Sequence, residues 1–272
     1  MLQFKITDSE FKLFKTFIYD YAGINLSDEK KALVTSRLSK RLRHHSLNSF
    51  KEYYDLMMLS APDGERQITI DLLTTNETYF FREPKHFDFL KKEILLKWGG
   101  GKTFRLWSAA SSSGEEAYSI AMMLDDVLQG RPWEIFGSDI SSRVLKKAQQ
   151  GHYLQDRIDG IPPQYLRKYC LKGTGEHEGT LLIDKQLRQR LTFSPMNLKK
   201  PLGEVGFFDV IFLRNVLIYF DQETKAKVIK QLVEKMKPGG YLFIGHSESL
   251  KGINDNLESV IPTVYQKIVK VK

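Results

Sequence analysis

An apolar strand, a turn of small residues and an amphipathic helix follow one another within Phe104–Leu128, and this order constrains the fold more than any other feature. Phe104, Leu106 and Trp107 supply the strand, and the small residues of Ala109–Gly114 supply the turn. Small side chains allow a ligand to lie close to the backbone. The pattern therefore predicts a strand–turn–helix unit of the kind that holds a nucleotide-like ligand.

The turn differs from the two common phosphate-binding patterns. It contains one glycine, Gly114, and no lysine, and Glu115 and Glu116 follow it directly. Two carboxylates at a helix N-terminus repel phosphate but suit a ligand with cationic and hydroxyl groups, such as S-adenosylmethionine. A second interpretation stays open, in which both glutamates only complement the helix dipole.

Two further apolar segments end in polar residues. Trp133–Asp139 ends in an acid that could bind ribose hydroxyls or could simply cap a helix over Ser141–Gln149. Phe208–Leu213 is expected to be a buried strand, and Arg214 and Asn215 follow it. Polar residues in this position lie at the carboxyl end of a strand, where α/β proteins bind ligands.

The C-terminal part continues the alternation of helices and strands. We expect a helix over Gln222–Met236, a stop at Lys237–Gly240 and an apolar strand over Tyr241–Gly245. Strands alternating with helices predict an α/β fold with a parallel, doubly wound sheet.

Four blocks together resemble the CheR family of chemotaxis receptor methyltransferases. They are Leu73–Glu83 (LTTNETYFFRE), Ser111–Ser119 (SSSGEEAYS), Arg214–Phe220 (RNVLIYF) and Gly245–Ser249 (GHSES). The resemblance covers nearly the whole chain. It implies a Rossmann-like S-adenosylmethionine-dependent sheet domain, an N-terminal all-helical domain and a small antiparallel β-subdomain as an insert. The implied activity is esterification of glutamate side chains on the cytoplasmic helices of methyl-accepting chemotaxis receptors.

The domain boundaries follow from this organisation. Residues 1–74 are expected to form the helical receptor-docking domain, 75–83 a linker that contributes to the active site, and 84–272 the methyltransferase domain. The helical part reads as three helices between Thr7 and Leu59, a break at Ala61–Gly64 and a helix from Glu65 to about Thr74. The insert, about 153–190, resembles the subdomain that grips a receptor tether peptide in some family members. It could equally be an ordinary surface hairpin.

The resemblance also implies roles for single residues. Arg82 and Tyr219 match the positions that orient the substrate carboxylate, and Arg82 could contact the cofactor too. The matching S-adenosylmethionine positions are Asn76, Thr78, Arg82, Glu116, Asp139, Asn197, Leu198, Arg214 and Asn215. The expected product is S-adenosylhomocysteine, and we expect no metal.

A net charge of +8 points to an acidic partner, and basic residues are concentrated in one early helix. Val34, Leu38 and Leu42 recur every four residues, so one face of this helix enters a core. We expect its basic face to dock on the receptor through Arg37, Lys40, Arg41 and Arg43. A merely solvated surface is the alternative interpretation.

Composition and short motifs limit the cellular location and the classes of function that the chain can have. A single cysteine, Cys170, excludes an internal disulfide and a cysteine-based metal cluster, which together with the lack of a signal peptide or long apolar run predicts a cytoplasmic protein. We expect neither nucleic-acid binding nor membrane insertion. His246-Ser247-Glu248 lacks the elbow motif of a hydrolase. Two alternatives remain, a methyltransferase for another acidic partner such as RNA and a non-catalytic, S-adenosylmethionine-sensing receptor adaptor.

Overall fold

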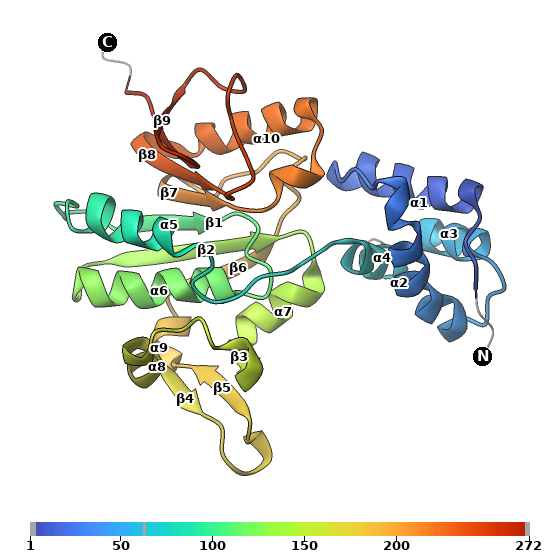
Figure 1. Ribbon diagram of the computed structural model, residues 1–272, viewed down its shortest axis with the longest axis horizontal. Helices are drawn as coiled ribbons and strands as arrows, with labels where there is room; N and C mark the ends of the chain where they lie inside the picture. The colour runs from blue at the N-terminus through green and yellow to red at the C-terminus, as the bar shows by residue number, and fades with distance from the viewer. Residues whose placement is uncertain (1–3, 62–63, 270–272) are drawn as a thin grey trace.

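The N-terminal helices form a small domain beside a larger α/β domain (Figure 1). The structure is a computed structural model that describes residues 4–61 and 64–269. The helices of the small domain are α1 Asp8–Ala22, the 3-10 turn η1 Asp28–Lys30, α2 Lys31–His44, α3 Phe50–Leu59 and α4 Glu65–Leu73. These match the expected helices. The break expected at Ala61–Gly64 includes Pro62 and Asp63, which lie outside the described residues.

Local signals set the bounds of α1. The Thr7 hydroxyl accepts a hydrogen bond from the Glu10 backbone N–H, and the Glu10 carboxylate accepts one from the Thr7 backbone N–H, so a capping box begins the helix. Gly23, at φ 75°, ends it in the left-handed region that favours glycine. The domain has its own core, in which Phe14, Leu38 and Tyr53 are fully buried.

The α/β domain is built on a seven-stranded sheet of order β6-β2-β1-β7-β8-β10-β9. Its strands are β1 Phe104–Ser108, β2 Trp133–Asp139, β6 Leu191–Pro195, β7 Phe208–Leu213, β8 Met236–Ile244, β9 Leu257–Ile261 and β10 Val264–Lys267. The first five strands in this order are parallel, as the sequence predicts. The expected parallel sheet is extended at one edge by a part that the sequence did not predict, in which β10 pairs antiparallel with β8 and with β9.

A second difference concerns the end of α10, Gln222–Glu234. The sequence predicts that this helix reaches Met236 and that the next strand begins at Tyr241. Instead β8 begins at Met236, which pairs with Phe208, and the pairing register shifts before Val210 and Tyr241. The segment Lys237–Gly240 is therefore an irregularity inside the strand, a place where proline and glycine are tolerated.

Helices cover both faces of the sheet. They are α5 Pro84–Phe89, the π-helical segment η2 Leu90–Leu95, α6 Glu115–Leu128, α7 Ser142–Gln150 and α10. Phe87 and Ile120 bury against Leu106 in one core, whereas Val228 packs on Ile211 in another. The central strands are consequently buried on both sides, which explains their nearly continuous apolar sequence.

The insert forms the expected small antiparallel sheet, of order β3-β5-β4, and projects from the α/β domain (Figure 1). Its elements are β3 His152–Leu154, η3 Gln155–Arg157, α8 Pro163–Tyr169, β4 Cys170–Lys172, η4 Gly175–His177, β5 Thr180–Ile183 and α9 Lys185–Arg188. The Tyr165 and Tyr169 hydroxyls donate hydrogen bonds to Asp126 and Asp125 of α6, which fixes the subdomain to the sheet domain. Among the described residues, no helix combines the length and apolarity needed to cross a bilayer.

Candidate functional site

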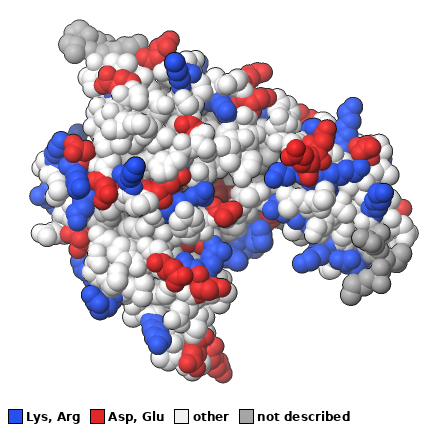
Figure 2. All heavy atoms as spheres, viewed as in Figure 1, with Lys and Arg blue, Asp and Glu red and all other residues white. Residues whose placement is uncertain are grey.

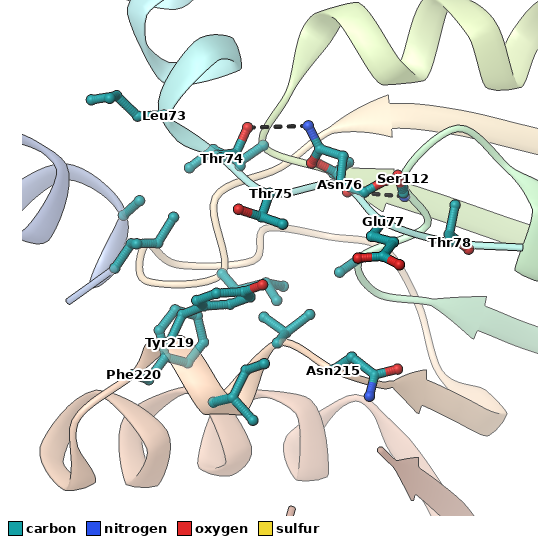
Figure 3. A pocket seen from close by; sticks show the side chains of 18 of the residues that line it. Leu73, Thr74, Thr75, Asn76, Glu77, Thr78, Ser112, Asn215, Tyr219 and Phe220 are labelled. Atoms are coloured by element: carbon teal, nitrogen blue, oxygen red, sulfur yellow. Dashed lines mark hydrogen bonds between the residues drawn. The ribbon is translucent and has the colours of Figure 1, made fainter. Parts of the chain in front are cut away.

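A cavity of about 360 Å³ lies between the helical domain and the carboxyl ends of the central strands. Its size falls within the range of ordinary ligand sites. Figure 2 shows a hollow between the two domains with basic side chains at its edge. The linker residues 74–78 run along one side of the cavity, and Figure 3 shows Tyr219 facing Thr75 across it.

The cavity unites all the cofactor and catalytic residues that the resemblance implies. Its lining includes Asn76, Thr78, Arg82, Glu116, Asp139, Asn197, Leu198, Arg214, Asn215 and Tyr219. These residues come from the linker, from α6, from the last position of β2, and from the segments that follow β6 and β7. The residues at the carboxyl ends of the strands lie where ligands bind in α/β proteins in general. The linker residues were predicted only from the resemblance to the family.

The small-residue turn after β1 forms one wall of the cavity through Ala109, Ala110 and Ser112. Gly114, at φ 96°, begins α6, and a Cβ atom there would come within 3.0 Å of the Ala148 Cβ and the Tyr153 hydroxyl. The Ser112 hydroxyl donates a 2.9 Å hydrogen bond to the carbonyl of Asn76. The turn is thus held against the linker.

The Asp139 carboxylate lies at the cavity and next to the start of α7. Its carboxylate accepts hydrogen bonds from the backbone N–H groups of Ser112, at 3.0 Å, and Ser141, at 2.9 Å, next to the start of α7. The same side chain is buried and lines the cavity. Burial raises the pKa of Asp139 to about 6, although the backbone hydrogen bonds favour the charged form.

Only one glutamate of the Glu115-Glu116 pair lines the cavity. Glu116 lines it and accepts a 2.7 Å hydrogen bond from the Ser108 hydroxyl. Glu115 is buried and is bonded instead to the Ser113 hydroxyl at 2.6 Å and to Arg157 at 2.9 Å. We expected both carboxylates to face a cationic ligand. Of the two, Glu116 lies at the cavity and Glu115 does not.

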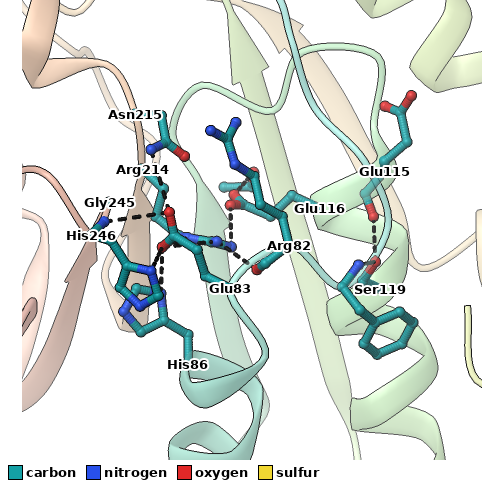
Figure 4. Close-up of polar contacts among 12 residues, drawn as sticks. Arg82, Glu83, His86, Glu115, Glu116, Ser119, Arg214, Asn215, Gly245 and His246 are labelled. Atoms are coloured by element: carbon teal, nitrogen blue, oxygen red, sulfur yellow. Dashed lines mark hydrogen bonds and ion pairs between the residues drawn. The ribbon is translucent and has the colours of Figure 1, made fainter. Parts of the chain in front are cut away.

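Arg214 connects two carboxylates across the floor of the site (Figure 4). Its guanidinium lies 3.1 Å from a carboxylate oxygen of Glu83 and 3.1 Å from one of Glu116, and its side chain is only 2% exposed. It also donates to the carbonyl of Arg82 at 2.5 Å. Burial raises the pKa of Glu116 despite Arg214, whereas for Glu83 the charge of Arg214 and the backbone N–H of His246 outweigh burial and lower the pKa.

Arg82 and Tyr219 line the cavity, and within residues 4–61 and 64–269 few of their side-chain polar atoms have a hydrogen-bond partner. The Arg82 guanidinium donates to the carbonyl of Glu77 at 3.1 Å and lies 5.4 Å from the centre of the Tyr79 ring. Tyr219 is held by its backbone, because its carbonyl accepts a hydrogen bond from the Asn25 N–H. Both side chains can therefore reach a ligand in the cavity.

No sequence pattern predicts the part of the cavity that the helical domain supplies. Ala22, Ile24–Ser27, Lys30 and Leu33 line it. The contact is fixed by Asn197, whose amide donates to the carbonyl of Tyr21 at 2.6 Å, and by Lys199, whose ammonium donates to the carbonyl of Tyr19 at 2.7 Å. These partners are far apart in the chain, so no local pattern could have paired them.

The contact that Arg157 of the insert makes with the linker was also not predicted, because its partners lie far away in the sequence. Its guanidinium donates 2.9 Å hydrogen bonds to the carbonyl of Thr78 and to the Glu115 carboxylate. The insert therefore contacts the linker that carries the candidate site.

The four basic residues of α2 do not form one free face. Arg37 donates 3.0 Å hydrogen bonds to the carbonyls of Leu72 and Thr74 and so caps the end of α4. Arg41 is paired with Glu65. Both arginines are used within the helical domain, while Lys40 and Arg43 are exposed.

Comparison with known proteins identifies the family of this chain. Residues 76–266 match the family model described as CheR methyltransferase, SAM binding domain, and residues 9–74 match the model described as CheR methyltransferase, all-alpha domain. The chain is 41% identical over 263 residues to the chemotaxis protein methyltransferase of Escherichia coli, an alignment that covers 96% of this chain and 91% of the relative. It is 38% identical over 266 residues to chemotaxis protein methyltransferase 2 of Pseudomonas aeruginosa, covering 97% and 94%. The chain therefore belongs to the CheR family of S-adenosylmethionine-binding methyltransferases.

Proposed function

We propose that this protein transfers the methyl group of S-adenosylmethionine to glutamate side chains of chemotaxis receptors and forms glutamyl methyl esters. The relatives are named chemotaxis protein methyltransferases. The observation that carries the proposal is the cavity, which places Arg82 and Tyr219 beside the residues expected to hold the cofactor. The expected product is S-adenosylhomocysteine, and the expected location is the cytoplasm.

The residues of the cavity suit S-adenosylmethionine. Asp139 offers a carboxylate for ribose hydroxyls, and Glu116 offers one near the end expected to hold a cationic group. Asn197 and Leu198 would contact the adenine, and Asn76 and Thr78 would contact the methionine part. Asn215 would form part of the floor of the site. The Arg214 side chain is already paired on two sides, so its segment would contact the cofactor through its backbone.

The chemistry requires positioning rather than proton transfer. A glutamate with a pKa near 4.3 is already an anion at pH 7, so it needs no general base. The bound cofactor supplies an electrophilic methyl group on a sulfonium. Arg82 would hold one carboxylate oxygen with its forked donors, and Tyr219 would give a directional hydrogen bond, leaving the other oxygen aligned with the methyl group.

The proposal is tested by transfer of labelled methyl from S-adenosylmethionine to cytoplasmic fragments of receptors. We expect label that mild base removes, as for an ester, and that is absent from fragments lacking their target glutamates. Base-stable label would contradict ester formation. Label on RNA instead of receptor in a parallel reaction would identify a different acidic substrate, and receptor binding without turnover would identify an adaptor.

Replacement of Asp139 tests the cofactor assignment. We expect Asp139→Ala to raise the Kd for S-adenosylmethionine about tenfold to hundredfold, because it removes hydrogen bonds to a charged group. The pKa of Asp139 is raised to about 6, so its charged form is lost as pH falls through 6. The Kd of the unmodified protein should therefore rise between pH 7.5 and pH 5, and that of Asp139→Asn should rise less over the same range. Calorimetric titration measures both, and lower turnover with unchanged Kd would contradict the assignment.

Charge reversal on α2 tests receptor docking through the two exposed residues. We expect Lys40→Glu combined with Arg43→Glu to lower kcat/KM for receptor about tenfold at low salt and less at high salt, because long-range steering is screened. The Kd for S-adenosylmethionine should not change. Lys227→Glu with Lys230→Glu, on the exposed side of α10, is the matched control. Equal loss in both double variants would indicate a general charge effect rather than docking.

The insert is the proposed site for a receptor tether peptide. Leu154 and Leu171 are 60% and 55% exposed on its small sheet, and β3 and β4 are its edge strands, so an extended peptide could pair there. Titration of the protein with the C-terminal peptide of a receptor measures this binding. Affinity that survives Leu154→Ser and Leu171→Ser would place the peptide elsewhere.

A further inference from the structure

Three side chains of types that can ligate a metal ion lie close together near Arg82. Glu83 follows Arg82 directly, His86 lies in α5, and His246 follows β8 (Figure 4). One ligand atom of each lies within 4.8 Å of the others. The Glu83 Oε2 atom is 3.3 Å from His86 Nδ1 and 4.0 Å from His246 Nδ1.

His86 is buried with one ring nitrogen unmatched. The side chain is 1% exposed, and its Nδ1 has no hydrogen-bond partner among the described residues. Its Nε2 lies 2.7 Å from the Thr263 hydroxyl, and that hydroxyl donates its own hydrogen to the carbonyl of Pro262. His86 must then donate through Nε2, which leaves a bare lone pair on Nδ1, 3.3 Å from the nearer Glu83 carboxylate oxygen. Two acceptors this close repel one another, and a cation bound by both would remove that repulsion.

We propose that Glu83, His86 and His246 form a binding site for a divalent transition-metal ion, with zinc as the best match. Zinc binds histidine nitrogen and carboxylate oxygen at about 2.1 Å, so two ligand atoms of a tetrahedral site are separated by about 3.4 Å. The 3.3 Å separation of Glu83 Oε2 and His86 Nδ1 meets this requirement. His246 is 53% exposed and can rotate to close the longer distance, leaving the fourth position to water.

The charged groups around the proposed site include carboxylates that offset the positive charge of Arg214. Arg214 lies 3.1 Å from Glu83 Oε2 and opposes a second cation, but Glu116 lies 3.1 Å from the same guanidinium and offsets it. Two carboxylates, those of Glu83 and Glu116, thus face the single guanidinium of Arg214. The other Glu83 oxygen accepts weak hydrogen bonds from the Asn215 amide and the His246 backbone N–H, which would orient the ligating carboxylate.

The ion would act on the segment that carries the candidate catalytic arginine. Glu83 has a left-handed backbone at φ 60°, a strained conformation for a residue other than glycine. An ion bound to Glu83, His86 and His246 would tie this turn to the end of β8. It would thereby fix the backbone of Arg82 without entering the cofactor cavity.

Zinc titration of the untagged, chelator-treated protein tests the proposal. We expect one Zn²⁺ per chain by calorimetry. Loss of an outer partner of a metal ligand typically weakens affinity about 10- to 100-fold, so loss of a ligand in His246→Ala should weaken it at least about 100-fold. His44→Ala, which removes an exposed histidine on α2, is the matched control and should bind as the unmodified protein does.

Nitrogen-15 spectra of the histidine rings give a second measurement that needs no variant. We expect Zn²⁺ to shift the Nδ1 resonances of His86 and His246 and to leave those of the other four histidines in place. Zinc affinity unchanged by His246→Ala, unshifted Nδ1 resonances, or no binding at all would each overturn the proposal. The readout is independent of methyl transfer, so the proposed function and the metal site can fail separately.

Discussion

Arg82→Ala is expected to lower kcat for receptor methylation about 100- to 1000-fold while changing the Kd for S-adenosylmethionine less than about threefold. Loss of a residue that positions the substrate carboxylate for in-line attack has costs of this order, because a misplacement of the reacting atoms by about 1 Å already costs about 100-fold. Among the described residues, the Arg82 side chain is bonded only to the carbonyl of Glu77, so most of its donors are available to a carboxylate. Single-turnover kinetics with preformed cofactor complex would separate the chemical step from binding.

Arg82→Lys and Arg131→Ala are the controls. Lysine keeps the charge but not the planar fork, so its activity should fall between that of the unmodified protein and that of Arg82→Ala. Arg131 is exposed and donates to the carbonyl of Trp98 away from the cavity, so its removal should leave kcat unchanged. A large rise in Kd with kcat retained would instead assign Arg82 to the cofactor.

The sheet could be predicted where strands are buried and not where they are exposed. β7 is buried along nearly its whole length, and its continuous apolar sequence marks it clearly. β9 is largely exposed, and its sequence LESVI carries no such signal. The antiparallel edge was therefore missed. Lys237–Gly240 was misassigned because residues that normally end an element here occupy an irregularity within β8.

The site could be predicted where it follows the strand ends. Asp139 and Arg214 immediately follow or end strands of a parallel sheet, and such positions converge at one edge. Hydrophobic periodicity, in contrast, predicts which face of a helix is apolar and which is polar, but it does not predict which other helices lie next to the polar face. It placed Arg37 and Arg41 of α2 on a basic face, although α4 supplies partners for both. The contribution of Ile24–Ser27 depends on packing between domains, which no local pattern encodes.

The second large effect concerns stability. Arg214→Met is expected to lower the free energy of unfolding by about 3–5 kcal/mol at pH 7.5, because it leaves the buried carboxylates of Glu83 and Glu116 without their shared cation. The carbonyl of Arg82 also loses its donor. Trp98, Trp107 and Trp133 all lie in the α/β domain, so urea unfolding followed by tryptophan fluorescence reports on the part that contains Arg214.

The pH dependence distinguishes this cause from a simple packing defect. In the unmodified protein the pKa of Glu83 is lowered, so its contribution is present above its unfolded pKa of about 4.5 and is lost only as pH falls through the lower folded value. Without Arg214, the remaining hydrogen bonds from His246 and Ser108 oppose burial less strongly, so the pKa of both carboxyls should rise and the variant should recover stability as they become protonated. The difference in free energy should therefore shrink between pH 7.5 and pH 5. Arg131→Met, an exposed control, should show little loss at either pH, and a deficit for Arg214→Met that is independent of pH would show that lost packing, not unpaired charge, destabilises the variant.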